Sequence, residues 1–513
     1  MSSSSPYSIA ALKRSTMHFL SGKVVSALLT FAILLLLVRL LPVEEYGVYI
    51  TLTVGMELAI IITALGLPFT LGRFLPEFRL YASGKTLTHF VRQIFILISL
   101  LLAAGTLLLF MAMPWLLQSL NIEQYTNVAR LYLLVLLLEG LGIHLRLNAL
   151  SPLLQQGQAQ ISQIARNLTL LLLLCIAAVQ GAVHLHHVVL AEIVASIAGG
   201  ALALRGLVKH LHGLRNIPGS DDWQPPTWSE KWHVARHMYF SYLVTMGSGP
   251  QLFTFLIQRY LGAEATALFG FMRRLFELGY MYLPATLLAE LLRPKLVASY
   301  VGKGGMTELS RNANLMGKIS LFVLMPILSL TWLAGSELLS LLSGEKFTES
   351  GHYLAALLLA LIPLSQRTIL ESVAMTCNKS QFCTWASFLT IVALPLGYLL
   401  LEAGYGIWSV IIAMFTAQII FNFSVNGALM HSTSYRVDTI GFFKLMAAGL
   451  MSYVLTQLVA HQFSLPTHGL VGLFTLATLA GSFYLLATYF FKPFRRDELD
   501  RMVHLIKHKI SDK

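Results

Sequence analysis

The sequence predicts an all-α integral membrane protein with about fourteen transmembrane helices, in two pseudo-symmetric six-helix lobes plus two C-terminal helices. Hydrophobic residues make up 56% of the 513 residues, more than a soluble globular protein of this length needs. Fourteen apolar stretches reach roughly the 20 residues that span a bilayer. Their spacing is helical or uniformly apolar, which excludes an outer-membrane barrel of alternating strands.

The expected spans follow one another closely along the chain. They cover residues 17–41, 48–71, 89–113, 126–149, 162–182, 187–208, 237–261, 266–292, 314–334, 351–375, 382–402, 405–429, 438–460 and 469–491. Helix breakers inside or beside these stretches, namely Gly247, Gly249, Pro250, Pro284 and Pro363, predict places where spans bend.

An internal repeat divides the chain. At an offset of 220 residues, charged residues superpose as the pairs Arg39/Arg259, Glu44/Glu264, Glu57/Glu277 and Arg73/Arg293. Both halves are expected to start on the same side of the membrane, so they are parallel repeats related by an axis along the membrane normal. Two similar halves around a midplane site are a common transporter design.

Charge distribution predicts the topology. The chain has 36 Lys and Arg residues and a net charge of +12. Most of these basic residues fall on the cytoplasmic side when the N-terminus is placed there. Fourteen spans then return the C-terminus to the cytoplasm. We attribute the positive charge to topology beside anionic lipid and expect no nucleic-acid partner. No cleavable signal is expected, because the first stretch is long and carries Lys23.

The predicted organisation has five parts. They are an N-lobe at 1–208, a polar cytoplasmic connector at 209–236, a C-lobe at 237–435, two extra spans at 436–492, and a cytoplasmic tail at 493–513. The tail is expected to form a surface amphipathic helix.

Ten ionisable residues fall within the expected spans. They are Glu57, Glu139, Glu192, Glu277, Glu290, Glu371, Lys23, Arg273, Arg274 and Arg367. At about 2.5–3.5 kcal/mol each, facing lipid would cost about 25–35 kcal/mol, more than the roughly 5–15 kcal/mol of stability a typical protein has. Most must therefore face each other or a wet cavity, which indicates transport of something polar.

Arg273 and Arg274 form the densest positive charge at mid-membrane, and no counterpart occurs in the first half. Adjacent residues face different sides of a helix, so Glu277 is expected to neutralise only one of them. The spare guanidinium suits an anion, above all a phosphate. Lys23 could join this site or extend to the inner interface.

Glu57 and Glu277 are the mirrored carboxylates near mid-bilayer, and we expect them to balance charge or bind a coupling ion. The secondary candidates are Arg367, Glu371, Arg39 and Arg259. Arg367 and Glu371 are four residues apart and equally suit a packing pair. Arg39 and Arg259 lie at outer span ends, where long side chains reach the interface.

Other chemistry is not indicated. The cluster His184-Leu185-His186-His187 lacks a recognised metal-ligand spacing, so no metal site is expected. No phosphate-binding GxxxxGK[ST] motif and no nucleophile elbow occurs. No cofactor is therefore expected, and transport would run on a proton or sodium gradient, the membrane potential or the substrate gradient.

Two segments resemble polysaccharide flippases of the MATE-like (MOP) superfamily. Residues 38–49, VRLLPVEEYGVY, are similar to the "aRlLgpeeyG.y" first loop of Wzx-type O-antigen and exopolysaccharide transporters. Residues 337–347, ELLSLLSGEKF, are similar to the "eil.llfG.eY" segment before span 10. The chain departs from the pattern at Pro42-Val43, where the family usually has Gly-Pro.

The resemblance implies a MATE-like fold whose two lobes enclose a cationic cavity in a bacterial cytoplasmic (inner) membrane. The implied substrate is an oligosaccharide on undecaprenyl pyrophosphate, whose lipid tail stays in the bilayer. Membrane lipids and polysaccharide polymerases or assembly proteins are further candidate partners. The family's cavity arginines match no motif here, so Arg273, Arg274 and Lys23 rest on depth and charge alone.

Three rival functions remain. A cation-coupled multidrug exporter of the same superfamily would favour cationic substrates and spare carboxylates. An integral-membrane polymerase or ligase needs a large outer loop, and every outer loop here is short. A scaffold for cell-surface assembly would not need ten intramembrane charges.

Overall fold

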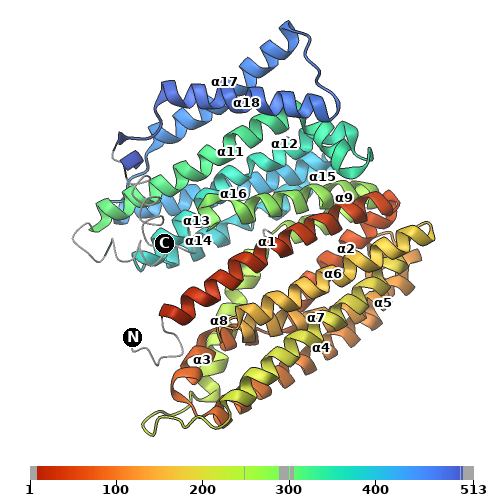
Figure 1. The fold of residues 1–513 in the computed structure, drawn as a ribbon, viewed down its shortest axis with the longest axis vertical. Coiled ribbons are helices and arrows are strands. Elements are labelled where there is room, and N and C mark those ends of the chain that lie inside the picture. Colours follow the sequence, from red (N-terminus) through yellow and green to blue (C-terminus); the bar gives the residue numbers. More distant parts are fainter. Residues whose placement is uncertain (1–8, 248, 288–299, 301–304, 497, 501–513) are drawn as a thin grey trace. The chain divides into compact units, whose positions relative to one another are not determined.

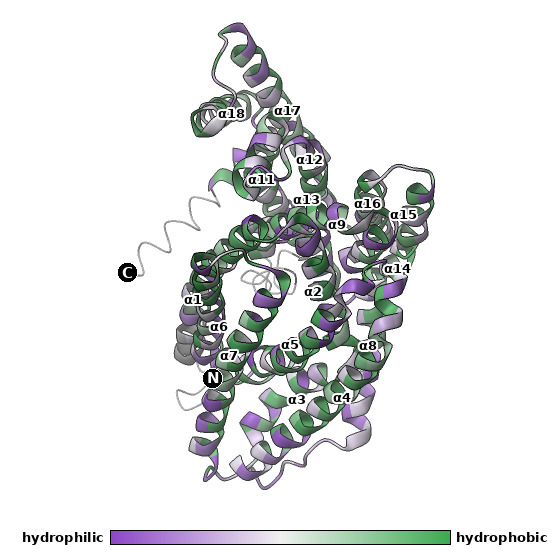
Figure 2. Ribbon diagram, turned by 90° about the vertical axis from the view of Figure 1, so that its right-hand side faces the viewer, coloured by the Kyte–Doolittle hydropathy of each residue, from purple (hydrophilic) through white to green (hydrophobic). Residues whose placement is uncertain are grey.

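The computed structural model describes residues 9–247, 249–287, 300, 305–496 and 498–500, and all regular elements there are helices (Figure 1). Hydrophobic residues dominate these helices (Figure 2). Twelve helices in the described ranges are long and apolar enough to cross a membrane, which confirms the predicted class. The expected spans 237–261 and 266–292 fall on α8 and α9, which are not among the twelve, so the count of fourteen stays a prediction.

The chain divides into two compact units. The first unit comprises Met1–Met246 and Thr254–Gly270, and the second comprises Gly247–Phe253 and Phe271–Lys513. The boundary between Met246 and Gly247 lies close to the end of the polar connector predicted at 209–236. Only residues 215–227 of that connector lie outside helices, because α7 continues to Leu214 and α8 begins at Trp228.

The first unit is built from eight α-helices, a π-helical turn (η2) and a 3-10 turn (η1). They are α1 (Ile9–Leu40), α2 (Val43–Thr63), α3 (Leu67–Tyr81), α4 (Gly84–Ser119), η1 (Glu123–Tyr125), α5 (Thr126–His144), η2 (Leu145–Leu150), α6 (Gln156–Gln180), α7 (Leu185–Leu214) and α8 (Trp228–Met246). Residues 254–270 of α9 (Pro250–Tyr282) also belong to this unit.

The second unit contains the rest of α9 and the helices that follow it. They are α11 (Gly305–Ser343), η3 (Thr348–Ser350), α12 (Gly351–Leu359), α13 (Leu361–Thr376), α14 (Gln381–Thr390), α15 (Ala393–Glu402), α16 (Ile407–Ser432), α17 (Thr439–Gln462) and α18 (Gly469–Phe491). The surface helix expected at 493–513 lies largely outside the described residues, as do Glu290 and Arg293.

Glycine and proline break several expected spans into two helices. The span expected at 48–71 is interrupted at Gly66, whose φ of 77° is left-handed and whose Cβ would meet the Ala235 carbonyl oxygen at 2.2 Å. As predicted, α8 ends at Met246 and α9 restarts with Gly249 as N-cap and Pro250 at its first position. The expected spans 351–375 and 382–402 are likewise each two helices.

The repeat is visible in the local backbone. Gly262, with φ 85°, interrupts the helical conformation within α9, and it lies 220 residues after Pro42, the N-cap of α2. Glu57 and Glu277 therefore lie equally far into the helices that follow these two turns. A Cβ on Gly270 would meet the side chain of Ile50, its own repeat equivalent, at 2.4 Å. The absence of a side chain at Gly270 permits this close helix contact.

Hydrogen bonds from two other loops hold the start of α2, within the segment 38–49 that carries the flippase resemblance. Glu45 accepts hydrogen bonds from the Leu185 backbone N–H at 2.5 Å and pairs with His184 Nδ1 at 2.9 Å, at the N-terminus of α7. Glu44 accepts from Gln124 and from the Tyr125 hydroxyl, both at 3.3 Å. A carboxylate at a helix N-terminus also interacts favourably with the helix dipole. The motif thus has a structural role in the first unit.

We expect Glu45→Ala to lower the free energy of unfolding by about 1.5–3 kcal/mol, because it removes a charge-assisted acceptor at the N-terminus of α7. Thermal unfolding of the purified protein in detergent measures this effect. The control is Glu123→Ala, an exposed carboxylate near the same face. If both variants lost the same free energy of unfolding, the Glu45 contacts would contribute no more than an exposed carboxylate does.

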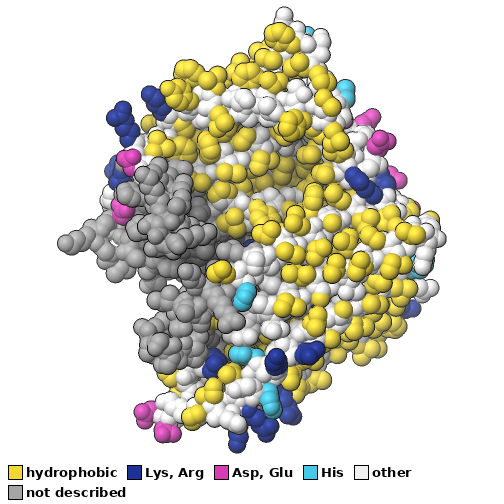
Figure 3. All heavy atoms as spheres, in the orientation of Figure 1, with side chains coloured by type: hydrophobic (Ala, Val, Ile, Leu, Met, Phe, Trp, Pro, Cys, Tyr) yellow, Lys and Arg dark blue, Asp and Glu magenta, His cyan; other side chains and the backbone are white. Residues whose placement is uncertain are grey.

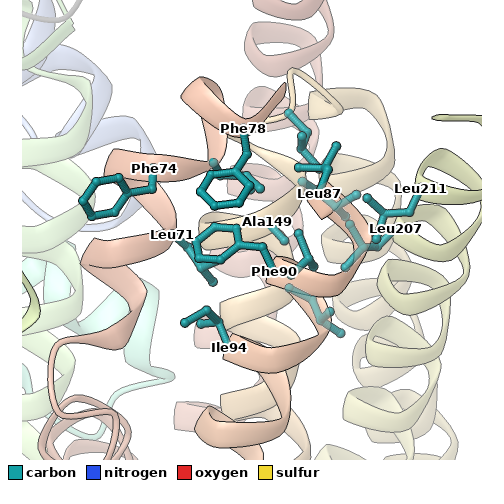
Figure 4. Close-up of a cluster of buried hydrophobic side chains, with 14 of the residues drawn as sticks. Leu71, Phe74, Phe78, Leu87, Phe90, Ile94, Ala149, Leu207 and Leu211 are labelled. Carbon is teal, nitrogen blue, oxygen red and sulfur yellow. The ribbon is translucent and has the colours of Figure 1, made fainter. Parts of the chain in front are cut away.

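A buried apolar cluster holds the opposite end of the first unit together (Figure 4). Phe78 of α3 stacks on Phe90 of α4 with ring centroids 4.1 Å apart. Leu207 and Leu211 of α7 and Ala149 of η2 complete the cluster. Apolar burial therefore packs the consecutive helices α3 and α4 against η2 and α7, which are distant from them in sequence.

Candidate functional site

The predicted Arg273-Arg274 pair lies on α9 in the second unit. Arg273 Nε donates to Glu277 Oε1 at 2.7 Å, and Arg274 Nη1 donates to Glu277 Oε2 at 2.9 Å. The Arg273 side chain is buried, whereas those of Arg274 and Glu277 are 31% and 32% exposed. One carboxylate thus bridges two guanidiniums on one helix.

The expectation that Glu277 pairs with only one arginine was wrong. Residues three and four positions apart both neighbour a given residue on a helix surface. Arginine is long enough for Arg273 and Arg274 to approach the two oxygens of Glu277 from adjacent positions.

A second arginine–carboxylate pair lies on α13 of the same unit. Arg367 Nε donates to Glu371 Oε1 at 2.9 Å, and its guanidinium lies 4.0 Å from the ring centroid of Phe421. Glu371 is 35% exposed. The Tyr280 hydroxyl of α9 and the Thr368 hydroxyl of α13 are 2.9 Å apart, which links the two helices one turn from both pairs. We name Arg273, Arg274, Glu277, Arg367 and Glu371 the C-unit cluster.

Glu57 and Lys23 belong to the first unit. Glu57 lies part-buried on α2. Lys23 is part-buried on α1, and its ammonium lies 5.1 Å from the ring centroid of Phe19.

Arg39 and Arg259 are exposed at helix ends in the first unit. Arg259 Nη1 donates to Asn121 Oδ1 at 2.9 Å, and Asn121 Nδ2 donates back to the Arg259 carbonyl oxygen at 3.4 Å. Arg259 thus fixes the turn after α4, which favours the packing interpretation for this residue.

A buried ion network in the first unit was missed from sequence. Arg146 Nη2 donates to Glu139 Oε1 at 2.5 Å, Arg166 Nε lies 2.8 Å from Glu139 Oε2, and Arg166 also pairs with Glu192. The Tyr49 hydroxyl donates to Glu192 at 3.0 Å. Glu139 and Glu192 stood out in sequence as intramembrane carboxylates, but Arg146 and Arg166 lie near the ends of their expected spans. The seven-residue spacing of Glu139 and Arg146, two turns apart, was the available signal.

Exposure separates the two groups of charges. All four side chains of the first-unit network are at most 12% exposed, and its two positive and two negative charges cancel. Gly199 makes room for Arg166, because a Cβ there would lie 2.8 Å from Arg166 Cβ. The C-unit cluster instead keeps three side chains about one-third exposed. The first arrangement is closed, and the second is partly exposed.

A second missed network anchors the last two helices. Lys318 of α11, which is fully buried, donates to Asp438 at 2.8 Å and to Glu498 at 2.5 Å. Asp438 caps α17 through the Gly441 N–H. Burial opposes ionisation of Asp438, but hydrogen bonds from Lys318 and Gly441 outweigh it and lower the pKa of Asp438 below its ordinary 3.8. This network fastens the start of α17 and the segment after α18 to α11.

Because the folded-state pKa of Asp438 is depressed, its stabilisation is present above the unfolded pKa and is lost as pH falls through the folded pKa. We expect the difference in Tm between the wild type and Asp438→Asn to be constant near neutral pH and to shrink below pH 3.8. Melting curves across pH 3–7 measure it, with exposed Asp221→Asn as control. A difference independent of pH would contradict this assignment.

No group of three or more His, Cys, Asp or Glu side chains in the described ranges is arranged to hold a metal ion. His184, His186 and His187 do lie together, with the rings of His186 and His187 3.8 Å apart. His184 instead pairs with Glu45.

Residues 12–287 match the model of a family described as polysaccharide biosynthesis protein. No curated protein matches the chain. Among solved structures, the chain is similar to the lipid II flippase MurJ in an inward closed conformation, at 13% identity and a TM-score of 0.71, over 92% of this chain and 98% of that one.

Two transporters share the fold as well. An inward-facing multidrug resistance MATE family transporter of the MOP superfamily matches at 15% identity and TM-score 0.61, over 79% of this chain and 95% of that one. A MOP superfamily transporter from Pyrococcus furiosus, described as having a binding pocket of reversed polarity, matches at 14% identity and a TM-score of 0.56. The match covers 82% of this chain and 96% of that one. These identities show the fold alone, and they confirm the predicted MATE-like architecture.

Proposed function

We propose, on the premise that this chain belongs to the polysaccharide biosynthesis protein family, that it is a flippase for lipid-linked oligosaccharides. Its substrate is an oligosaccharide on undecaprenyl pyrophosphate, moved from the cytoplasmic to the outer leaflet of the bacterial cytoplasmic membrane by alternating access. Both termini are cytoplasmic in this proposal. Similarity of fold to a protein named as a lipid II flippase supports the substrate class.

The partly exposed arginines and carboxylates of the C-unit cluster carry this proposal. Partly exposed charges within a membrane-embedded unit are costly against lipid, so they are retained where water or a charged ligand meets them. Planar guanidiniums match phosphate oxygens in a two-pronged geometry. Arg274 is the exposed member of the pair and the first contact, while buried Arg273 holds Glu277 in place. Lys23 is a further candidate for the pyrophosphate.

Glu277 gives the site a way to couple substrate translocation to a proton or sodium gradient. Pyrophosphate oxygens compete with Glu277 for the same two guanidiniums, and a displaced carboxylate becomes available to a proton or a sodium ion. Glu57 has the equivalent position in the repeat and balances charge in the first unit. Translocation that ignores both pH and sodium gradients would contradict this role.

The multidrug exporter is the second candidate, since the fold is shared with a MATE transporter. A cationic drug favours a site lined mainly by carboxylates, whereas the C-unit cluster contains three guanidiniums. Charge therefore favours the anionic lipid-linked glycan.

Proteoliposomes distinguish the two functions. We expect the purified protein to expose a fluorescent, pyrophosphate-linked oligosaccharide on the opposite leaflet, where a membrane-impermeant quencher reaches it. The same vesicles should not accumulate a cationic dye under proton or sodium gradients. Dye transport without glycan translocation would establish the exporter and overturn the flippase.

A further inference from the structure

A basic pocket of about 470 Å³ lies on the first unit, where α4 begins and α7 ends. It shares no residue with the C-unit cluster. Its polar lining comes mainly from three α4 residues and two α7 residues, with an exposed valine beside them. These are Lys85, His89, Arg92, His212, Arg215 and Val208. Figure 3 shows Lys, Arg and His side chains gathered at the lower edge of the molecule.

Helix geometry builds this pocket on a rigid base. Lys85, His89 and Arg92 follow one face of α4 at spacings of four and three residues. The other face of α4 carries Leu87 and Phe90 into the buried cluster of Figure 4. A Cβ on Gly84 would lie 1.8 Å from the Leu214 carbonyl oxygen, so the two helix ends are in close contact. The basic side chains therefore project from a fixed framework.

The charges in this pocket lack the neutralisation seen elsewhere in the protein. Within the described part of the chain, no carboxylate forms an ion pair with Lys85, Arg92 or Arg215, whereas exposed Arg73 pairs with Glu77 at 3.1 Å. Lys85 also lies in the first turn of α4, where the helix dipole disfavours a cation. A bound anion would reduce the mutual repulsion of the basic side chains and the unfavourable interaction of Lys85 with the dipole of α4.

An apolar stripe continues from the pocket along the same helix faces. On α4, exposed Ile96 and Leu100 follow Arg92 at four-residue steps. On α7, exposed Val208 and Leu204 precede His212 at the same spacing. A basic end joined to an apolar stripe complements an amphiphile with an anionic headgroup rather than a soluble anion.

We propose that this pocket binds the phosphate-bearing headgroup of an anionic phospholipid, whose acyl chains lie along α4 and α7. The predicted topology places it at the cytoplasmic leaflet. The bound lipid holds the ends of α4 and α7 together and fixes the depth of the first unit in the membrane.

Native mass spectrometry of the full chain in detergent tests this proposal, with dioctanoyl phosphatidylglycerol and dioctanoyl phosphatidylcholine as probes. The variant Lys85→Gln/Arg92→Gln/Arg215→Gln should bind phosphatidylglycerol on the order of 100-fold more weakly, because each basic side chain contributes about five-fold. The control Lys379→Gln/Arg436→Gln/Lys444→Gln removes equal charge from the second unit and should bind as the wild type does. Arg215→Gln alone should lose about five-fold.

Three results would overturn the proposal. Equal weakening in the pocket and control variants would mean that only net charge matters. Equal binding of phosphatidylcholine would exclude an anionic headgroup. Competition by inorganic phosphate at the same concentration as phosphatidylglycerol would assign the pocket to a soluble anion instead of a lipid.

Discussion

Arg166→Ala is expected to lower the free energy of unfolding by about 3–5 kcal/mol, because it leaves Glu139 and Glu192 buried without their shared partner. The arginine bridges α5 and α7 from α6, so its loss affects three helices together. Denaturant or thermal unfolding in detergent measures the change.

The matched control is Arg73→Ala. The Arg73 side chain is 59% exposed and forms an ion pair with Glu77. Surface pairs contribute about 0–1 kcal/mol, so this variant should melt close to the wild type. Replacing Glu192 as well, in Arg166→Ala/Glu192→Gln, should recover part of the loss, because Glu139 keeps Arg146 as its partner. A double variant no more stable than Arg166→Ala would argue against a penalty from unpaired buried charge.

The double variant Arg273→Ala/Arg274→Ala should remain folded but translocate substrate at least about 100-fold more slowly at limiting substrate. Each lost charge-assisted hydrogen bond to phosphate is worth about 1.5–3 kcal/mol, and the variant loses at least two. Initial rates in proteoliposomes measure this loss, and surface polysaccharide in cells provides a second measurement at matched protein levels.

Arg39→Ala/Arg259→Ala is the control, since it removes two arginines of the repeat that lie at exposed helix ends. Its translocation rate should stay near that of the wild type. If the Arg273/Arg274 variant makes normal amounts of surface polysaccharide at normal protein levels, the phosphate assignment is wrong.

Hydrophobic patterning was sufficient to predict the fold class, because a bilayer accepts few backbone arrangements other than helices. It also located Gly249-Pro250 as a break, since these residues end and restart helices through local backbone preferences alone. The break at Gly66 was missed. Gly66 adopts a left-handed conformation, and Ala235, which lies 169 residues away in sequence, approaches too closely to leave room for a side chain there.

Charge partners were harder to predict than helices. The pairs Arg273–Glu277 and Arg367–Glu371 follow from four-residue spacing on one helix. Arg166–Glu192 and Lys318–Asp438 join different helices, so only the packed structure brings them together. Position along an expected span therefore identified which ionisable residues lie within the membrane. It did not identify which of them neutralise one another.

Comparison of pyrophosphate-linked and monophosphate-linked forms of one oligosaccharide tests the central claim most directly. Translocation of both forms should be measured in proteoliposomes with the wild type and with Arg273→Ala/Arg274→Ala. We predict that the wild type prefers the pyrophosphate form by about 10-fold or more, the value of one additional charge-assisted hydrogen bond, and that the double variant loses this preference. An unchanged preference in the double variant would contradict the assignment of these arginines to the pyrophosphate.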